Sequence, residues 1–483
     1  MDNDLITKDK GRLGGAPGTL APAPERPTAA PLGSFWPNRA QLSQLLALAV
    51  PVVVVQVGSM LLGVVDTIMV GRVSATDLAG VALGNLYFFA CALLGMGVLF
   101  ALDPVIAQAM GAGDEDQVAR GLQRGVALAT LLGVALVLPM VPAGFVLGVL
   151  RQPAEVIPVA RGYVLAVLAG LVPHLLFIVF QRSLQAIGWV KPIVITVVLG
   201  NLVNAFFNWI LVFGNWGAPA LGGVGSGWAS TIARFFMAAL LLLVAWPRLG
   251  RYLRPLRPEA LRLAPLRALA GLGLPMGAQM LLEFGAFAAI GLLMGWLGTV
   301  ALAGHQIALN LASLTFMVPL GVAQATAVLV GRAVGRGDPD GARRAAGAGL
   351  GVGALFMATT AALFLAMPGL LARLYSDEPE VIAVAVALIP LAGIFQVFDG
   401  LQVVAGAVLR GIGDTRAAMI VNALGFWLFG MPLSMLLGFT LGTGPRGLWW
   451  GLVAGLVTVA VFLLLRVRHR FGGELKRLVL AGH

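Results

Sequence analysis

The chain has 483 residues, of which 59% are hydrophobic and only 11% are charged. A soluble globular protein carries about 25% charged residues, so this composition excludes an ordinary soluble domain and indicates a protein that spans a membrane. The formal net charge is +11, but the basic residues lie in short segments between apolar stretches, so nucleic acid is not an expected partner.

Twelve apolar stretches are long enough to cross a bilayer as a helix, which takes roughly 20 residues. In chain order the predicted spans are 41–70, 79–110, 121–149, 157–180, 190–213, 224–246, 267–297, 300–331, 345–372, 381–408, 417–440 and 447–466. Apolar and polar residues do not alternate with period two, so a transmembrane β-barrel is not expected. The sequence therefore predicts an all-α membrane protein of about twelve transmembrane helices.

The basic residues are distributed unevenly between the two sides of these spans. If the N-terminus is cytoplasmic and the helices alternate, most of the 32 Lys and Arg residues fall in cytoplasmic segments, which is the positive-inside pattern. The largest group, six arginines between Arg248 and Arg267, is interpreted as an orientation anchor, with a specific lipid or partner site as the alternative. We expect a multi-pass inner-membrane protein with both termini in the cytoplasm.

The two halves of the chain repeat one another at an offset of about 224 residues. The matching residues are Pro51 and Pro275, Gly111 and Gly335, Gly113 and Gly337, Asp114 and Asp338, and, with one residue inserted, Gly188 and Gly413. Six helices per repeat is an even number, so both halves enter the membrane from the same side. Parallel repeats of this kind are typical of secondary transporters, in which the substrate path runs between the halves.

This repeat gives a predicted domain organisation. It consists of a disordered cytoplasmic tail (1–40), an N-lobe of six helices (41–246), a basic cytoplasmic linker (247–266), a C-lobe of six helices (267–466) and a cytoplasmic C-terminal tail (467–483).

Four carboxylates, Asp66, Asp103, Glu283 and Asp399, fall inside the apolar stretches. Each costs on the order of 2.5–3.5 kcal/mol at the centre of a membrane helix, so each needs a reason to be there. Arg234 is the one basic residue in the interior of these stretches, since the others lie within five residues of an end, so at most one acid can be neutralised by it. Glu283 and Asp399 lie deepest and can exchange a proton, a metal cation or a cationic drug. Asp103, which precedes a proline, is interpreted as stabilising a kinked helix.

Asn204 and Asn208 are four residues apart and therefore face the same side of one helix. Their amides can serve a proton relay or a hard cation such as Na⁺, which prefers oxygen ligands. A hydrogen bond between helices is the alternative interpretation.

An ordered series of segments resembles the multidrug and toxic compound extrusion (MATE) family, in particular its NorM branch. Val65-Asp66-Thr67-Ile68-Met69-Val70-Gly71 resembles the first-helix signature of that family. Further similar segments are Lys191-Pro192, Leu202-Val203-Asn204, Asn208-Trp209, Gly222-Gly223-Val224-Gly225, Ala229-Ser230-Thr231, Glu283, Ala303-Gly304-His305-Gln306-Ile307-Ala308, Gly331, Gly335, Phe395 to Asp399, and Leu409-Arg410-Gly411-Ile412-Gly413-Asp414. The resemblance covers residues 40 to 470, and its specificity lies in the ordered series rather than in one motif.

The resemblance implies two V-shaped lobes and export of organic cations in exchange for inward H⁺ or Na⁺. It implies an N-lobe cation site lined by Asp66, Asn204, Asn208 and Thr231, and a C-lobe cation and substrate site at Glu283 and Asp399. Either set can supply Na⁺ ligands. Phe395 stands where relatives carry a tyrosine, so one hydroxyl ligand is missing, and this favours H⁺ slightly over Na⁺.

Four other classes of membrane protein fit these residues less well. A lipid-linked or polysaccharide flippase of the same wider superfamily usually has a basic central cavity, whereas the deep charges here are acidic. A major-facilitator transporter shares the two parallel halves but not the other segments. The chain has no motif of an intramembrane enzyme, and its polar residues are too scattered for a channel. The sequence thus predicts a monomeric antiporter of cationic and amphipathic drugs, with no cofactor beyond its coupling ion.

Overall fold

The computed structural model describes residues 35–478, so most of the tail predicted over residues 1–40 lies outside the described residues. Within them the chain is helical, without strands. The first half comprises α1 (Arg39–Val70), α2 (Ala75–Leu99), α3 (Leu102–Gly111), α4 (Glu115–Ala135), α5 (Val137–Met140), α6 (Ala143–Val149), α7 (Ile157–Leu168), α8 (Leu171–Ile187), α9 (Lys191–Leu211), η1 (Asn215–Gly217) and α10 (Gly222–Leu253). The second half comprises η2 (Pro258–Leu261), α11 (Leu263–Trp296), α12 (Thr299–Gly335), α13 (Pro339–Ala366), α14 (Pro368–Arg373), α15 (Pro379–Gly411), α16 (Thr415–Asn422), η3 (Ala423–Gly430), α17 (Met431–Met435), η4 (Leu436–Thr440) and α18 (Pro445–Phe471).

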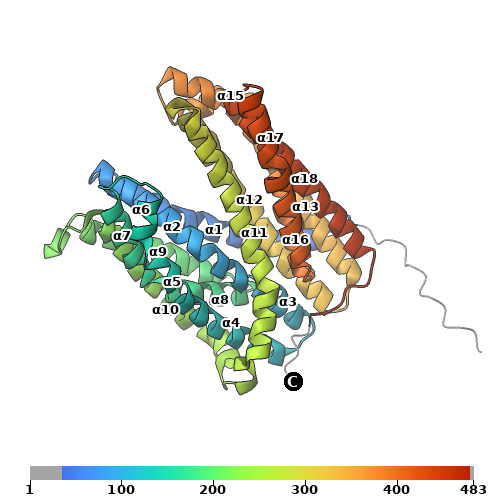
Figure 1. Cartoon of the computed structure of the whole chain (residues 1–483). Helices are drawn as coiled ribbons and strands as arrows, with labels where there is room; N and C mark the ends of the chain where they lie inside the picture. Colours follow the sequence, from blue (N-terminus) through green and yellow to red (C-terminus); the bar gives the residue numbers. More distant parts are fainter. Residues whose placement is uncertain (1–34, 479–483) are drawn as a thin grey trace, which may run out of the picture. The chain divides into compact units, whose positions relative to one another are not determined.

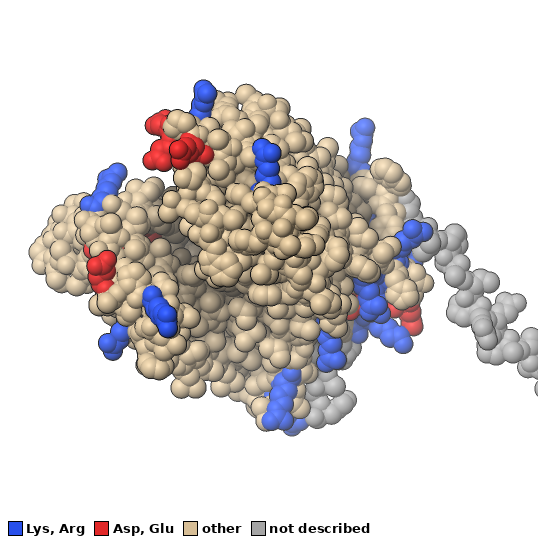
Figure 2. All heavy atoms as spheres, turned by 45° about the horizontal axis from the view of Figure 1, so that its top comes forward, with Lys and Arg blue, Asp and Glu red and all other residues tan. Residues whose placement is uncertain are grey.

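The predicted number of spans is confirmed. Over residues 35–478, eleven helices are long and apolar enough to cross a membrane, and α7 with α8, bent by 51° at their junction, make twelve if they form one span. Many large apolar side chains are exposed, including Leu138, Phe145 and Leu355. Figure 2 shows the same property on one face, where Lys, Arg, Asp and Glu are sparse. An apolar surface of this extent needs lipid around it.

The sequence repeat reappears as equivalent turns in the two halves. Asp114 accepts a hydrogen bond from the Gln117 backbone N–H (3.0 Å) and so caps α4, and Asp338 caps α13 in the same way. The preceding residues Gly113 and Gly337 have φ of 70° and 68°. Residues with a side chain rarely adopt this conformation, which explains glycine at both positions.

The two halves meet through glycines that occupy equivalent positions in the repeat. On α2, Gly97 lies directly against the backbone of Gly277 on α11, and its counterpart Gly321 on α12 lies against Val53 on α1. A second pair follows the same rule: Gly111 contacts the backbone of Arg332, and Gly335 contacts the backbone of Gln108. We call this contact the glycine seam. It resembles a two-fold interface in which each side offers the other the same patch.

The glycine seam lies toward the end of the bundle at which α11 begins and α3 and α12 end. In Figure 1 the opposite, upper ends of α11, α12 and α15 stand apart from α2 and α6 of the first half. The halves are thus joined at one end of their helices and separate at the other.

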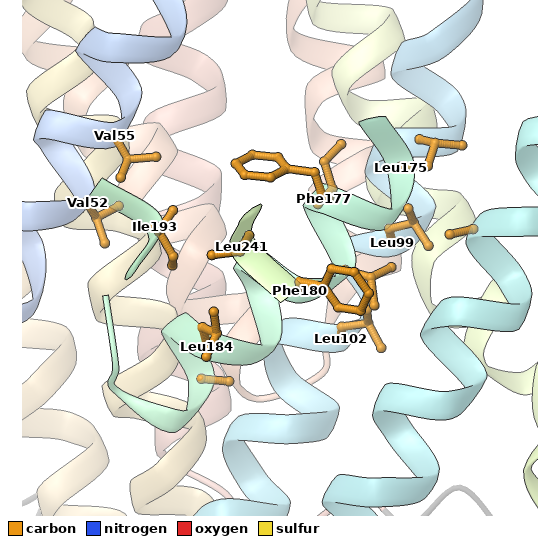
Figure 3. Close-up of a cluster of buried hydrophobic side chains, with 14 of the residues drawn as sticks. Val52, Val55, Leu99, Leu102, Leu175, Phe177, Phe180, Leu184, Ile193 and Leu241 are labelled. Carbon is orange, nitrogen blue, oxygen red and sulfur yellow. The ribbon is translucent and has the colours of Figure 1, made fainter. Parts of the chain in front are cut away.

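Apolar packing supports this arrangement. One buried cluster is built mainly from the first half; Figure 3 shows Val52 and Val55 of α1 beside Ile193 of α9. The same cluster extends across the glycine seam to Val322 and Val404 of the second half. A second buried cluster lies within the second half alone.

The residues after α18 return to the first half. Arg477 forms an ion pair with Asp114 (2.7 Å), and the Leu478 backbone N–H donates to Gln108 Oε1 (2.7 Å). Gln108 Nε2 in turn donates to the Gly411 carbonyl of the second half (2.8 Å). Residues 472–478 therefore form a strap that joins the halves beside the glycine seam.

A side chain added at the glycine seam should destabilise this arrangement. A Cβ at Gly97 would overlap backbone atoms of Gly277, whereas a Cβ at Gly351 on α13 would have no atom within 4 Å. We expect Gly97→Ala to cost about 1–3 kcal/mol, as overpacking does, and to lower the thermal unfolding midpoint of the purified protein. Gly351→Ala is the matched control and should be neutral or slightly stabilising. Equal midpoints for the two variants would contradict close packing at the seam.

The ion pair of the strap should contribute equally to stability across the physiological pH range. Partial burial opposes ionisation of Asp114, but hydrogen bonds from the Gln117 N–H and from Arg477 outweigh it and lower the pKa of Asp114 below its usual value. The carboxylate is therefore charged at neutral pH, and its contribution to stability is lost only as the pH falls below about 4. Arg477→Ala should lower the unfolding midpoint by the same small amount at pH 6 and pH 8, on the order of 1 kcal/mol or less since the pair is about one third exposed. A loss present only at one of these pH values would show that another group titrates here.

Candidate functional site

In the first half, Asp66 is buried and held by side chains from two other helices. Asn208 Nδ2 on α9 donates to Asp66 Oδ1 (2.6 Å), and Ser230 Oγ on α10 donates to Asp66 Oδ2 (2.8 Å). Asn204 Nδ2 donates to the same serine hydroxyl (3.4 Å). The spacing of Asn204 and Asn208 on α9 places both on the face that meets α1 and α10. These four side chains form one connected polar cluster within an apolar bundle.

The cluster retains acceptor capacity. The amide oxygens Oδ1 of Asn204 and Asn208 are buried and have no hydrogen-bond partner in the described part of the chain. Buried oxygens are ordinarily paired, so two unpaired oxygens beside a carboxylate indicate room for a donor or a cation. A hydronium-like proton carrier or Na⁺ suits such a set of oxygen ligands.

Thr231 and Arg234 lie near the cluster but contact other atoms. The Thr231 hydroxyl donates to the Ala166 carbonyl on α7 (2.7 Å) and not to Asp66. Arg234 donates to the Val167 carbonyl (3.3 Å), and its guanidinium lies 4.5 Å from the centre of the Phe88 ring. Arg234 is close enough to Asp66 for an electrostatic interaction, but the two do not form an ion pair.

In the second half, Glu283 on α11 and Asp399 on α15 are joined by one amide. Gln402 Nε2 donates to Glu283 Oε1 (2.9 Å) and lies 3.5 Å from Asp399 Oδ1. Gln402 is buried, and its Oε1 has no partner among the described residues. Residues 399 and 402 are one helical turn apart, so both face α11. Two carboxylates and a free amide oxygen therefore converge on one point.

Aromatic rings lie beside this carboxylate pair. Phe395, one turn before Asp399, packs edge-on against Phe287, one turn after Glu283, with ring centres 5.8 Å apart. On its other side Phe395 packs against Trp449 of α18 at 5.9 Å. Trp449 Nε1 donates to His305 Nδ1 on α12 (3.2 Å), so this histidine is paired inside the bundle. The rings give an apolar, polarisable wall next to two acids, an arrangement that favours organic cations.

The structure corrects the inventory of buried basic residues. The predicted span 157–180 leaves Arg182 outside the membrane, but α8 continues to Ile187 and Arg182 is 5% exposed. Arg182 Nη1 lies 3.3 Å from Asp103 Oδ2, and its guanidinium stacks 3.7 Å from the centre of the Phe100 ring. Arg234 is thus not the only buried base. Asp103 is neutralised within the first half by a buried ion pair, which accounts for its burial without a role in transport.

Asp66, Glu283 and Asp399 differ from Asp103 in this respect. In the described part of the chain, none of the three forms an ion pair with a basic side chain. Over residues 35–478 no group of three or more His, Cys, Asp and Glu gathers into a metal site. An ion held at either cluster would therefore depend on amide and hydroxyl oxygens as well as carboxylates.

Two members of these clusters were not predicted as site residues. Ser230 lies within the similar segment 229–231, from which the resemblance implies only Thr231 as a site residue. Gln402 follows Asp399 by three residues, so its position on the same helix face was available as a signal. The sequence does not show how α10 approaches α1 or how α15 approaches α11. These approaches decide which side chain reaches Asp66 in the first half and Glu283 in the second.

Comparison with known proteins agrees with this architecture. The model of the MatE family matches residues 51–210 and 275–436, that is, the repeat in each half. The multidrug resistance protein MdtK of Yersinia pseudotuberculosis is 37% identical over 436 residues, which cover 88% of this chain and 94% of that protein.

Solved structures share the fold. The eukaryotic MATE transporter AtDTX14 superimposes with a TM-score of 0.82 at 23% identity, covering 89% of this chain and 96% of that one. The MOP superfamily transporter of Pyrococcus furiosus gives 0.80 at 21% identity with the same coverage, and a variant of the Vibrio cholerae transporter VcmN gives 0.79 at 18%, covering 89% and 97%. The family match over both halves and the identity to MdtK show that this multi-pass membrane protein belongs to the MATE family of transporters.

Proposed function

We propose that this protein is a secondary active multidrug efflux antiporter, which exports organic cations and amphipathic drugs in exchange for inward H⁺ or Na⁺. The observation that carries the proposal is the pair Glu283 and Asp399, bridged by Gln402, without an ion-paired base and beside the rings of Phe287 and Phe395. A pair of this kind can bind a cationic drug or the coupling ion, but the two compete for the same negative charge. Competition for one site is what exchange requires.

The related MdtK is named for multidrug resistance, which supports drugs as the substrate class. Asp66 with Asn204, Asn208 and Ser230 supplies a second cation site in the other half. Binding of H⁺ or Na⁺ at this site neutralises the charge of Asp66. It therefore changes the free-energy difference between the conformation in which Asp66 is buried and a conformation in which Asp66 is accessible to solvent.

Alternating access requires the halves to separate at the glycine seam and to approach one another at the opposite end. The excess of Lys and Arg at the end with the seam supports a cytoplasmic position for that end and for both termini, with the protein in the inner membrane. With this proposed orientation, the described structure corresponds to a state closed toward the cytoplasm. We propose a monomer as the transporting unit, because each chain contains both halves of the pathway.

Transport by purified protein tests the proposal directly. The full chain in liposomes should move a fluorescent organic cation such as ethidium against its gradient when either a pH gradient or a Na⁺ gradient is imposed. Glu283→Gln and Asp399→Asn each remove one charge from the pair and should reduce the coupled rate by at least about tenfold, since a buried charge contact contributes about 1.5–3 kcal/mol.

The matched control is Asp377→Asn, which removes an exposed carboxylate from the loop before α15. It should transport like the unmodified protein. If folded protein moves no cationic dye with either ion, or if the pair variants transport as well as Asp377→Asn, the drug antiporter proposal is wrong, and a lipid-linked or polysaccharide flippase becomes the better hypothesis.

Ser230 and Thr231 are neighbours on α10, and their hydroxyls bond to different groups. Substituting each in turn tests whether the hydrogen bond to Asp66 matters for binding of the coupling ion. Ser230→Ala removes a hydrogen bond to Asp66, whereas Thr231→Ala removes one to the Ala166 backbone. We expect Ser230→Ala to weaken activation by the coupling ion roughly tenfold, because a hydrogen bond to a charged group contributes about 1.5–3 kcal/mol. Thr231→Ala should leave the ion concentration for half-maximal transport nearly unchanged. The reverse order would show that Thr231, rather than Ser230, serves the ion site.

A further inference from the structure

A basic cavity lies outside both carboxylate clusters, at the end of the bundle that carries the glycine seam. Its volume is about 800 Å³, and it is lined by Lys191, Arg248, Arg332 and Arg336, with no acidic residue among the described residues around it. Lys191 and Arg248 belong to α9 and α10 of the first half. Arg332 lies in the last turn of α12 in the second half, and Arg336 directly follows that helix. We call it the basic cavity.

Two of these cations are held in place by other contacts. Arg332 donates from Nε and Nη2 to the Ala186 carbonyl in the last turn of α8 (3.0 and 2.7 Å), where helix carbonyls carry partial negative charge. The Arg248 guanidinium lies 4.5 Å from the centre of the Trp189 ring. Neither contact neutralises a positive charge. The guanidinium groups are thus positioned in advance of any ligand.

The charges of the basic cavity are not balanced by protein acids. Over residues 35–478, none of its four basic side chains forms an ion pair with an aspartate or glutamate. Like charges gathered around one concave space raise the local potential and attract an anion. A planar guanidinium can bind two oxygens of a phosphate at once, which makes arginine a preferred phosphate ligand.

The apolar residues that line the basic cavity indicate which kind of anion it can bind. Leu48 and Pro51 of α1 and Leu329 of α12 form apolar walls of the same cavity. On the adjoining face of α1, Leu46, Val50 and Val54 are 40%, 58% and 44% exposed, and they repeat every fourth residue as an apolar column. A ligand that matches both parts has a phosphate headgroup and an acyl chain. The positive charge also separates this cavity from the path of cationic substrates.

From these observations we infer that the basic cavity binds the phosphate headgroup of an anionic phospholipid, with an acyl chain along the apolar column of α1. The lipid would contact both halves at once, through Lys191 and Arg248 on one side and Arg336 on the other. Its binding therefore favours the arrangement in which the glycine seam is closed. The effect on transport rests on the proposed function, but lipid binding itself does not.

Lipid binding is tested on the full purified chain by native mass spectrometry, with phosphatidylglycerol and phosphatidylcholine of identical acyl chains. The unmodified protein should retain phosphatidylglycerol in preference to phosphatidylcholine. Lys191→Gln combined with Arg336→Gln should weaken phosphatidylglycerol binding about tenfold or more. Each substitution removes one positive charge and so weakens the electrostatic attraction to the anionic headgroup. Arg332 is kept because it also holds the end of α8.

Two control variants make the result specific. Arg262→Gln with Arg468→Gln removes the same net charge from exposed positions and should bind lipid like the unmodified protein. Lys191→Arg with Arg336→Lys keeps the charge at both positions and should also retain binding, so a loss in the Gln variant is due to the missing charge rather than to substitution at these positions as such. The thermal unfolding midpoint of the Gln variant, which should match that of the unmodified protein, shows that it is folded.

Three outcomes would overturn the inference. The first is no preference for phosphatidylglycerol over phosphatidylcholine, and the second is an equal loss in the Arg262 and Arg468 control. The third is displacement of the lipid by an equal concentration of glycerol 3-phosphate, which would show that the cavity recognises a soluble phosphate rather than a lipid. None of these measurements depends on transport, so the failure of the antiporter proposal would be seen separately.

Discussion

The structure depends on one close contact, the meeting of the two halves through backbone at the glycine seam. Gly97 and Gly321 admit the approach of α2 to α11 and of α12 to α1, and Gly111 and Gly335 repeat the pattern at the helix ends. In lipid, helices gain no hydrophobic energy from leaving the solvent, so association depends on such close packing. The approach is equivalent on both sides because the chain is a repeat.

The charged groups in the bundle differ in whether a protein side chain of opposite charge contacts them. Asp103 and Arg182 neutralise one another, although Asp103 Oδ1 and Arg182 Nε have no hydrogen-bond partner among the described residues. Asp66, Glu283 and Asp399 receive hydrogen bonds but no opposite charge in direct contact. The hydrogen bonds fix the position of each carboxylate, while the missing countercharge leaves each one able to receive a cation, as the proposed exchange requires. The presence or absence of a countercharge therefore distinguishes Asp103 from these three carboxylates more clearly than depth in the membrane does.

The sequence predicted the number of spans and the two halves, which depend on apolar composition and repetition. It predicted fewer of the side-chain contacts, which depend on how the helices approach one another. Span length and apolar composition gave the helices, and the offset of the repeat gave two parallel halves. Helix ends were less predictable: α8 continues beyond residue 180, so Arg182 lies in the bundle and pairs with Asp103. The position of the carboxylates inside apolar stretches identified them, and the resemblance to MATE proteins implied their roles. The choice between Ser230 and Thr231, in contrast, requires the rotation of α10 relative to α1. Neighbouring residues on a helix point about 100° apart, and composition carries no information on that rotation.

The positions of the polar clusters relative to the glycine seam bear on how ion binding can move the halves. Asp66 is bound by α9 and α10 of its own half, and Glu283 by α15 of its own half, so neither site is built across the seam. An ion at one of them therefore acts through the helix that carries the carboxylate. α1 carries both Asp66 and Val53, and α11 carries both Glu283 and Gly277, so each of these helices joins an ion site to the seam within one rigid element. A change in charge at the carboxylate can tilt or straighten that helix, and Pro51 and Pro275 lie in these same two helices near the seam contacts. Under the proposed function, each half thus connects its carboxylate to the glycine seam through one helix, although Asp66 and Glu283 do not occupy matching positions in the repeat.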